Sequence, residues 1–345
     1  MKHIALGAAL FLSALTAAGA LAQTPPPYHV SKTVALGAPD RWDYVVFDRG
    51  RVYVSHGDRV TVVDGKSGAI LGNVEGMPGG THGIGISAAT GKGYTDDGKA
   101  GIAVAFDLKS FKTAARIPAK DDADGIAFDP TSGHIFVVDG DSAALTVIDP
   151  KTDAAIATIP TGGGMEYAVA GDNGKLYVNG AEKKEIVRID TATNTVDAHW
   201  PIPGCTSPHG LAIDTAHHRL FPTCLNAVLT VVNTDDGSVV ATLPIGQGTD
   251  GAAFDPKRKL VFSSNYDGTL SVIRENSPNS FVSLGSIKTA ITGKNMGIDP
   301  ASGRIYLIVA DVDPNAPVPP STNGRMARRA VLPGSVKLLF LDPRP

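Results

Sequence analysis

Hydrophobic and polar positions along this chain follow one recurring phrase: a polar residue, a small or apolar triplet, a further apolar residue and then, usually, Asp. The phrase occurs seven times, at 43–48, 82–87, 124–129, 166–171, 209–214, 250–255 and 294–299. Its last positions are 39, 42, 42, 43, 41 and 44 residues apart. A repeat of about 40 to 50 residues is typical of one four-stranded blade of a β-propeller.

Each copy continues with the same succession of short runs. After a turn comes a second β-rich run, as in 51–54 and 175–178, and then a third that usually closes on Asp or Asn, as in 61–64 and 230–233. A polar turn leads to a fourth run, such as 154–159. A single four-stranded sheet leaves its apolar faces exposed to solvent, whereas in a ring of stacked blades the neighbouring blades cover both faces of each sheet. The sequence therefore predicts an all-β, seven-bladed β-propeller with four-stranded antiparallel blades.

The two ends of the chain are expected to complete the same blade. The seventh copy reaches its third strand at 336–342, and the sequence then ends without a fourth. Residues 28–36 have the pattern of the fourth strand of other copies. We predict that this N-terminal strand fills blade seven and closes the ring, so that residues 23–345 form a single β-propeller domain.

The first 22 residues have the pattern of a cleaved secretory signal. Lys2 precedes an apolar run at 4–15, and small residues follow up to Ala22. A membrane anchor is the alternative, but the run is shorter than the roughly 20 apolar residues that span a bilayer. We expect export, a periplasmic or secreted location and no membrane span.

Charge and composition narrow the choice of partner. The formal net charge is −3, with 31 basic residues scattered along the chain, and it becomes −4 once Lys2 is removed. Nucleic acid is therefore an unlikely partner, because its binding relies on a concentrated basic surface. We expect a monomer that binds a small molecule or a periplasmic protein.

Three phrases resemble those of a known family: 124–130 (Asp-Gly-Ile-Ala-Phe-Asp-Pro), 133–137 (Gly-His-Ile-Phe-Val) and 145–152 (Leu-Thr-Val-Ile-Asp-Pro-Lys-Thr). With the seven copies and the signal segment, they resemble the YncE-like, or YVTN-type, exported β-propellers over residues 28–342. The second runs depart from the family's Tyr-Val-Thr-Asn, reading Val-Tyr-Val-Ser and Leu-Tyr-Val-Asn among others. The resemblance implies the fold. Related propellers include lactonases and haem-binding or quinone-linked proteins, so it leaves the activity open.

The first residue of every copy can ionise, and all seven are expected where the innermost strands begin, around the mouth of the channel. They are Asp43, His82, Asp124, Glu166, His209, Asp250 and Lys294. A ligand could bind there, and carboxylates with neutral imidazole also suit a divalent metal held by His82, Asp124, Glu166, His209 and Asp250. The alternative is that these groups only cap strands and hold water.

Further polar residues follow the second runs, among them Asp96, Asp97, Asp139 and Asp141. They are expected to open on the same face and to enlarge an acidic basin, although ordinary turn chemistry explains each one alone.

A Pro-rich insertion at 311–335 interrupts blade seven. Its composition is that of a flexible loop. The alternative is a lid over the mouth that brings Arg325, Arg328 and Arg329 toward an anionic ligand or the acidic ring.

Cys205 and Cys224 are the two cysteines of the sequence. They flank the first two strands of blade five and should be close together at the mouth face, so we predict a disulfide, as an oxidising compartment allows. A thiolate metal site with His209 is the alternative.

The sequence lacks Gly-x-Ser-x-Gly, Walker-type and His-Glu-x-x-His motifs. We therefore expect a binding or accessory module that acts through the channel mouth. A metal-dependent, lactonase-like hydrolase is the first alternative, with Glu166, Asp124 or Asp250 holding the ion and His82 or His209 transferring protons. A redox accessory protein with non-covalent haem or quinone, ligated by His82 or His209, is the second.

Overall fold

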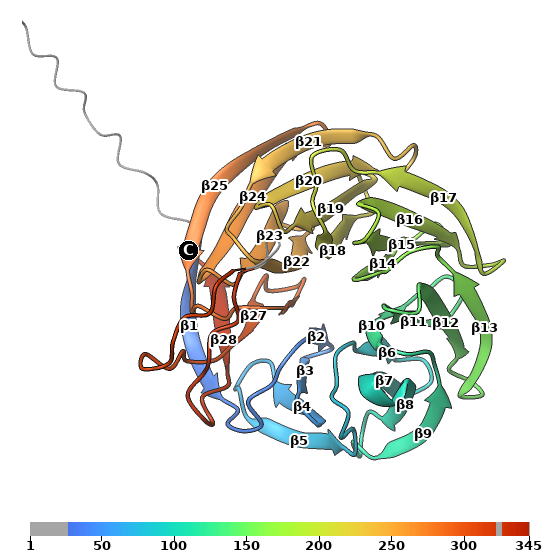
Figure 1. The fold of residues 1–345 in the computed structure, drawn as a ribbon, viewed down its shortest axis with the longest axis horizontal. Coiled ribbons are helices and arrows are strands. Elements are labelled where there is room, and N and C mark those ends of the chain that lie inside the picture. The colour runs from blue at the N-terminus through green and yellow to red at the C-terminus, as the bar shows by residue number, and fades with distance from the viewer. Residues whose placement is uncertain (1–26, 322–325, 345) are drawn as a thin grey trace, which may run out of the picture.

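The computed structural model describes residues 27–321 and 326–344, and its strands form seven four-stranded sheets. The sheets stand side by side as blades around a central axis (Figure 1). Neighbouring strands within each blade pair antiparallel, as in blade 3. The expected all-β, seven-bladed propeller is thus confirmed. Residues 1–22, the expected signal, lie outside the described residues.

The first four blades follow chain order. Blade 1 comprises β2 (Val45–Asp48), β3 (Arg51–His56), β4 (Arg59–Asp64) and β5 (Ile70–Glu75). Blade 2 comprises β6 (Gly85–Ser87), β7 (Lys92–Asp97), β8 (Ile102–Asp107) and β9 (Thr113–Pro118), with the short 3-10 helix η1 (Gly98–Ala100) between β7 and β8. Blade 3 comprises β10 (Ala123–Phe128), β11 (Ile135–Asp139), β12 (Ala144–Asp149) and β13 (Ala154–Pro160). Blade 4 comprises β14 (Ala168–Ala170), β15 (Lys175–Gly180), β16 (Glu185–Asp190) and β17 (Thr195–Pro201).

The last three blades complete the ring. Blade 5 comprises β18 (Pro208–Asp214), β19 (Arg219–Cys224), β20 (Val228–Asn233) and β21 (Val239–Pro244). Blade 6 comprises β22 (Thr249–Asp255), β23 (Leu260–Asn265), β24 (Thr269–Ser277) and β25 (Ser280–Lys288). Blade 7 comprises β26 (Met296–Ile298), β27 (Ile305–Val309), β28 (Lys337–Pro343) and, from the other end of the chain, β1 (Tyr28–Ala35). Within these described residues, no helix is long and apolar enough to cross a membrane.

The core lies between blades, because the middle strands are covered on both faces. Each second strand has one aromatic side chain that is at most 1% exposed: Tyr53, Tyr94, Phe136, Tyr177, Phe221, Phe262 and Tyr306. Buried side chains gather in seven clusters, each shared by two adjacent blades. The fourth strands are mostly exposed or half-buried, with one buried residue in β5 and in β9 and none in β17, because they lie at the outer edge of the ring.

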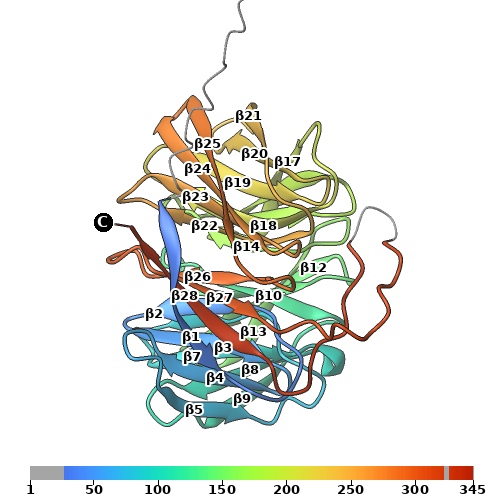
Figure 2. The same cartoon turned by 90° about the vertical axis from the view of Figure 1, so that its left-hand side faces the viewer.

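The ring closes by pairing strands from opposite ends of the chain. β1 runs antiparallel to β28, from Tyr28 opposite Pro343 to Ala35 opposite Lys337. Tyr28 is 1% exposed and its hydroxyl donates to Asp255 Oδ2 at 3.2 Å in the adjacent blade. The predicted closure of the last blade is confirmed, and Figure 2 shows β1 and β28 side by side at the edge of the ring.

The Pro-rich insertion joins β27 to β28 and projects from the ring (Figure 2). Its two limbs pair at one bridge, between Val312 and Val331, where the Asp313 amide also donates to the Ala330 carbonyl at 2.9 Å. The limb that returns toward β28 reaches the end of the channel at which the innermost strands begin.

Candidate functional site

The seven first residues of the repeats line one cavity at the channel mouth, although they come from seven blades. The cavity has a volume of about 470 Å³, and its lining includes all seven predicted side chains: Asp43, His82, Asp124, Glu166, His209, Asp250 and Lys294. They converge because each precedes or begins an innermost strand and these strands surround the axis. The seven residues thus share one cavity, and ligand binding there stays a prediction.

Glycines let the innermost strands approach one another closely around the mouth. A Cβ at Gly83 would lie 2.3 Å from the Asp124 carbonyl oxygen, and one at Gly210 would lie 2.6 Å from the Gly251 carbonyl carbon. Both distances are shorter than real Cβ contacts, so only glycine fits there.

A stacked pair of tyrosines forms part of the aromatic lining of the cavity, and the sequence analysis missed it. Tyr44 follows Asp43 in the first copy and Tyr167 follows Glu166 in the fourth, at the position where four other copies have glycine. Their rings stack with centroids 5.0 Å apart, although they belong to blades 1 and 4. Burial raises the pKa of Tyr167 to about 12, with smaller contributions from Asp43 and Asp250, so its hydroxyl is protonated at neutral pH. The seventh copy has Asn295 at this position, so the two tyrosines are the aromatic departures from the glycine pattern, and they were the signal in the sequence.

Lys294 neutralises one side of the mouth. Its ammonium lies 2.8 Å from Asp43 Oδ2 and 3.5 Å from Asp250 Oδ2, and Asn295 Nδ2 donates to Asp43 Oδ1 at 2.9 Å. Burial alone would raise the pKa of Asp43, but Lys294, His82 and the amide of Asn295 together lower it. Asp43 is therefore a fixed carboxylate that is paired within the protein.

His82 is held by a buried partner, Asp96 at the end of β7. Asp96 Oδ1 lies 2.9 Å from His82 Nδ1, and both Asp96 oxygens accept from the His82 amide. Burial disfavours the imidazolium, but Asp96, Asp124 and Asp43 outweigh it and raise the pKa of His82 to about 9. Burial also raises the pKa of Asp96 to about 7, so at neutral pH the pair holds a proton between the ring and the carboxyl, and Asp96 sets the orientation of His82.

Asp124, Glu166 and His209 form the opposite, acidic side. Burial, with repulsion by Asp43 and Glu166, raises the pKa of Asp124 well above its ordinary value. His209 Nε2 lies 3.7 Å from Glu166 Oε1, and its Nδ1 lies 3.2 Å from the Ser207 carbonyl oxygen. Asp124 and Glu166 also line an adjoining groove of about 320 Å³ with further acidic side chains, Asp122, Asp141 and Glu182. A cation placed here would lower the cost of ionising Asp124.

Arginines from the Pro-rich insertion line the same cavity. Arg328 and Arg329 are both part of its lining, and the Arg329 amide donates to the Tyr266 hydroxyl at 2.8 Å. Two of the three arginines therefore lie at the mouth, and their role as a lid stays a prediction. Arg325 lies outside the described residues.

The acidic residues after the second strands do not form the expected open basin. Asp96, Asp97 and Asp139 are at most 3% exposed and bond to the protein itself. Asp97 accepts from the Gly79 amide at 2.7 Å, and Asp139 accepts from the Thr146 hydroxyl at 2.7 Å. The strands β7 and β11 extend to include these residues, which buries the carboxylates instead of exposing them. Asp141 alone of the four lines the groove beside the mouth.

The mouth does not bring its metal-ligand types into a compact set. Among the described residues, one group of three His, Cys, Asp or Glu side chains has ligand atoms all within 4.8 Å of one another, and it contains none of the seven mouth residues. The five residues expected to hold a metal at the mouth, His82, Asp124, Glu166, His209 and Asp250, share the cavity but are spread around its wall.

Cys205 and Cys224 form the predicted disulfide, with Cα atoms 5.4 Å apart. Cys205 precedes β18 and Cys224 ends β19. The bridge removes both thiols, so the alternative of a thiolate metal site with His209 is wrong.

The fold and the mouth define the chain as a seven-bladed β-propeller with an ionisable cavity at one end of its channel. No protein-family model matches the sequence. Within that class the chain is similar to YncE, as the resemblance implied: a 141-residue stretch is 30% identical to the uncharacterised protein YncE of Salmonella typhimurium. The match spans 39% of this chain and 39% of that protein.

Solved structures of varied proteins share the fold. The WD40 repeats of RRP9 superpose with a TM-score of 0.74 at 10% identity, over 91% of this chain and 99% of that one. A streptogramin B lyase gives 0.71 at 14% identity, over 92% and 98%. The hydrazine synthase of Kuenenia stuttgartiensis gives 0.67 at 15% identity, over 85% and 95%. At such identities the similarity concerns the fold alone.

Proposed function

We propose that this chain is an exported, periplasmic binding module whose channel mouth holds a small ligand with both a positive and a negative group. The observation that supports it most is the division of charge within one cavity. Lys294, Arg328 and Arg329 line it together with the acidic pair Asp124 and Glu166. A cavity of about 470 Å³ lies within the range of small-molecule sites.

The electrostatics favour a ligand that completes the site. Burial and the charges of Asp43 and Glu166 raise the pKa of Asp124 despite the opposing effect of His82, which supports a ligand that compensates this carboxylate. An ammonium group beside Asp124 and Glu166 would supply that compensation, while a carboxylate would pair with Arg328 or Arg329. The stacked rings of Tyr44 and Tyr167 offer an apolar surface in the same cavity. Free amino acids and short peptides have this chemistry.

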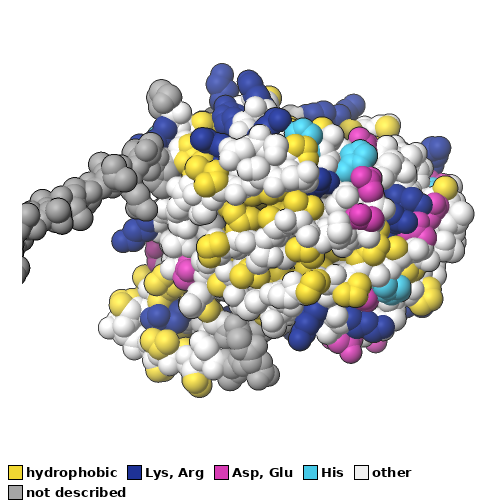
Figure 3. All heavy atoms as spheres, turned by 90° about the horizontal axis from the view of Figure 1, so that it is seen from above, with side chains coloured by type: hydrophobic (Ala, Val, Ile, Leu, Met, Phe, Trp, Pro, Cys, Tyr) yellow, Lys and Arg dark blue, Asp and Glu magenta, His cyan; other side chains and the backbone are white. Residues whose placement is uncertain are grey.

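Periplasmic location is part of the proposal. The signal-like segment at 1–22 supports it, and the Cys205–Cys224 disulfide is compatible with an oxidising compartment. On the face shown in Figure 3, acidic, basic and apolar side chains are mixed. That mixture gives no support for a nucleic-acid partner.

A ligand panel tests the proposal. Amino acids and dipeptides, carboxylates without an amine, and amines without a carboxylate would be compared by thermal shift and calorimetry at equal concentrations. We expect the doubly charged class to bind best, and Asp124→Asn to weaken its binding about tenfold, the effect of one lost charge-assisted bond. Asp235→Asn is the control, because Asp235 is an exposed turn residue outside the cavity. Equal binding of single-charge carboxylates, or no binding of any class, would refute the proposal.

The two alternative functions have direct readouts. A lactonase-like hydrolase would need several ligand atoms gathered around one ion, and the mouth residues are spread around the wall instead. Geometry therefore favours binding over metal-dependent hydrolysis, and lactone turnover with added Zn²⁺ or Mn²⁺ checks this. A haem or quinone would appear in the absorption spectrum of protein purified from its natural compartment.

A further inference from the structure

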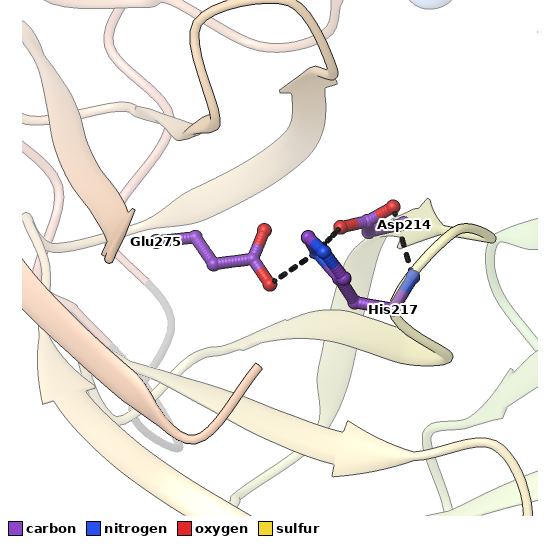
Figure 4. Close-up of side chains that lie close together, drawn as sticks. All are labelled: Asp214, His217 and Glu275. Atoms are coloured by element: carbon purple, nitrogen blue, oxygen red, sulfur yellow. Dashed lines mark hydrogen bonds and ion pairs between the residues drawn. The ribbon is translucent and has the colours of Figure 1, made fainter. Parts of the chain in front are cut away.

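A second cluster of titratable side chains lies at the end of the blades remote from the mouth, between blades 5 and 6 (Figure 4). Asp214 ends β18, His217 is in the turn that follows, and Glu275 is near the end of β24. His217 Nδ1 lies 2.8 Å from Asp214 Oδ2 and 3.0 Å from Glu275 Oε1. One ligand atom from each residue lies within 4.8 Å of the other two.

Glu275 has a buried carboxylate without the hydrogen bonds that buried carboxylates usually accept. It is 2% exposed, and neither of its carboxylate oxygens accepts a hydrogen bond of good geometry from any described residue. Oε1 is close to the His217 ring, as Figure 4 shows, but the ring does not point a hydrogen along that line. A buried carboxylate without such partners is costly while it is charged, so it needs either a proton or a cation to compensate it.

The repeat shows that the fold does not require a carboxylate there. In blades 1, 2, 4 and 5, the residue after the end of the ladder between the second and third strands is Gly65, Leu108, Thr191 or Thr234. In blade 6 it is Glu275, whose amide donates to the Lys259 carbonyl just as the Thr191 amide donates to Gly174. The backbone role is thus the same in these blades, and the carboxylate is added to it.

His217 is a similar addition. Three residues after the last Asp of the phrase, blades 3 and 7 have Ser132 and Ser302, whereas blade 5 has His217. Asp214 Oδ1 still caps the turn by accepting from the Ala216 amide at 3.0 Å, which leaves Oδ2 directed to the cluster. The His217 side chain is 26% exposed and provides access from solvent.

We propose that Asp214, His217 and Glu275 bind a divalent transition-metal ion, with Zn²⁺ as the probe. Two carboxylates and one imidazole are ligands that Zn²⁺ takes, and water would complete its coordination. The ion would bind the Nδ1 lone pair of His217, so the ring must be neutral with its proton on Nε2. It joins blade 5 to blade 6 and neutralises Glu275. This site is separate from the mouth and does not depend on the proposed ligand.

Zinc binding to the purified full chain tests this site. Equilibrium dialysis with elemental analysis at pH 7 should find one Zn²⁺ per chain. Glu275→Gln, which keeps the shape of the side chain, should lower the association constant at least about tenfold, because even an outer partner of a ligand contributes 10- to 100-fold. Zn²⁺ should also raise the Tm of the wild type and not that of the variant.

Two further variants make the outcome decisive. His217→Ala changes a turn residue and should lose the same binding, so it decides the matter if Glu275→Gln folds poorly. Glu166→Gln at the mouth should bind Zn²⁺ as the wild type does. Absence of stoichiometric binding to the wild type, or binding that survives His217→Ala, would overturn the proposal. Loss of binding in Glu166→Gln alone would place the ion at the mouth and equally overturn it.

Discussion

The two ends of each innermost strand differ in a way that separates folding from function. At the end remote from the mouth, five of the seven phrases finish on the same residue: Asp48, Asp129, Asp214, Asp255 and Asp299. Asp129 accepts from the Thr131 and Ser132 amides, and Asp299 similarly accepts from the Ala301 amide. A repeated residue here does a repeated task, which is to cap the turn into the second strand.

At the mouth end the same phrase begins with Asp, His, Glu or Lys, depending on the blade. These side chains bond to different partners: Asp43 to Lys294, and His82 to Asp96. Seven copies of one structural unit thus gather seven individual side chains around an axis. Variation within a repeat therefore indicates where a propeller has been specialised, even when a single sequence is at hand.

Removal of β1 should have the largest effect, because it opens the ring while leaving all seven mouth residues in the chain. Deleting residues 27–36 removes the ladder with β28 and the buried Tyr28 ring. Seven ladder positions at about 1 kcal/mol per hydrogen bond imply a loss of several kcal/mol, and the bare edge of β28 promotes aggregation. Thermal melts with light scattering measure this. An unchanged melting curve would contradict closure by β1.

A matched pair of variants in β22 compares the two ends directly. Asp255 is fully buried and accepts from the Lys257 and Arg258 amides and from the Tyr28 hydroxyl. Asp255→Ala should therefore cost about 2–4 kcal/mol, because it leaves several donors unpaired. Asp250→Ala, at the mouth end of the same strand, should cost about 1 kcal/mol or less. Chemical denaturation gives both values, and equal losses would abolish the distinction between the ends.

The fold was predictable because the signals in the sequence were local and repeated. The ladder ends of third strands such as β4, β12 and β16 fall on Asp64, Asp149 and Asp190, as the sequence predicted. A residue that ends a strand and caps a turn is chosen by local backbone chemistry, and it recurs in most blades.

The mouth was predictable as a place but not as a set of contacts. Repeat register placed the seven first residues together, whereas the stack of Tyr44 on Tyr167 depends on which blades face each other across the channel. Glu275 was missed for a similar reason. Its partners Asp214 and His217 come from the neighbouring blade, and no spacing in the sequence records that proximity.

The pair His82 and Asp96 should make stability depend on pH. The pKa of His82 is raised from 6.5 to about 9, so the imidazolium contributes stability that is fully present below pH 6.5 and lost as the pH rises to about 9. Asp96→Asn removes the carboxylate bonded to the ring and should lower this pKa. Imidazole proton shifts in NMR spectra report it directly, and Tm should fall more between pH 6.5 and 9 in the wild type than in the variant. A titration of His82 near 6.5 in both proteins would contradict the interpretation.

The smallest effect on stability is expected at Asp124. Unlike the variants above that lower stability, Asp124→Asn should raise it. Its pKa is raised above the ordinary value of 3.8 by burial and by the charges of Asp43 and Glu166. Such a group binds its proton more tightly when folded, so its contribution to stability is present at acidic pH and declines as the pH rises through the folded pKa. Asp124→Asn removes that decline and should stabilise the protein at pH 7 and above, by roughly 2–4 °C in Tm if the gain is about 1 kcal/mol.

Below pH 3.8 the wild type and Asp124→Asn should melt alike, apart from the difference between a carboxylic acid and an amide. Thermal melts at several pH values measure the trend. A variant less stable than the wild type at pH 8 would show that the Asp124 carboxylate is structural, as Asp255 is, and the comparison between the two strand ends would then fail at this blade.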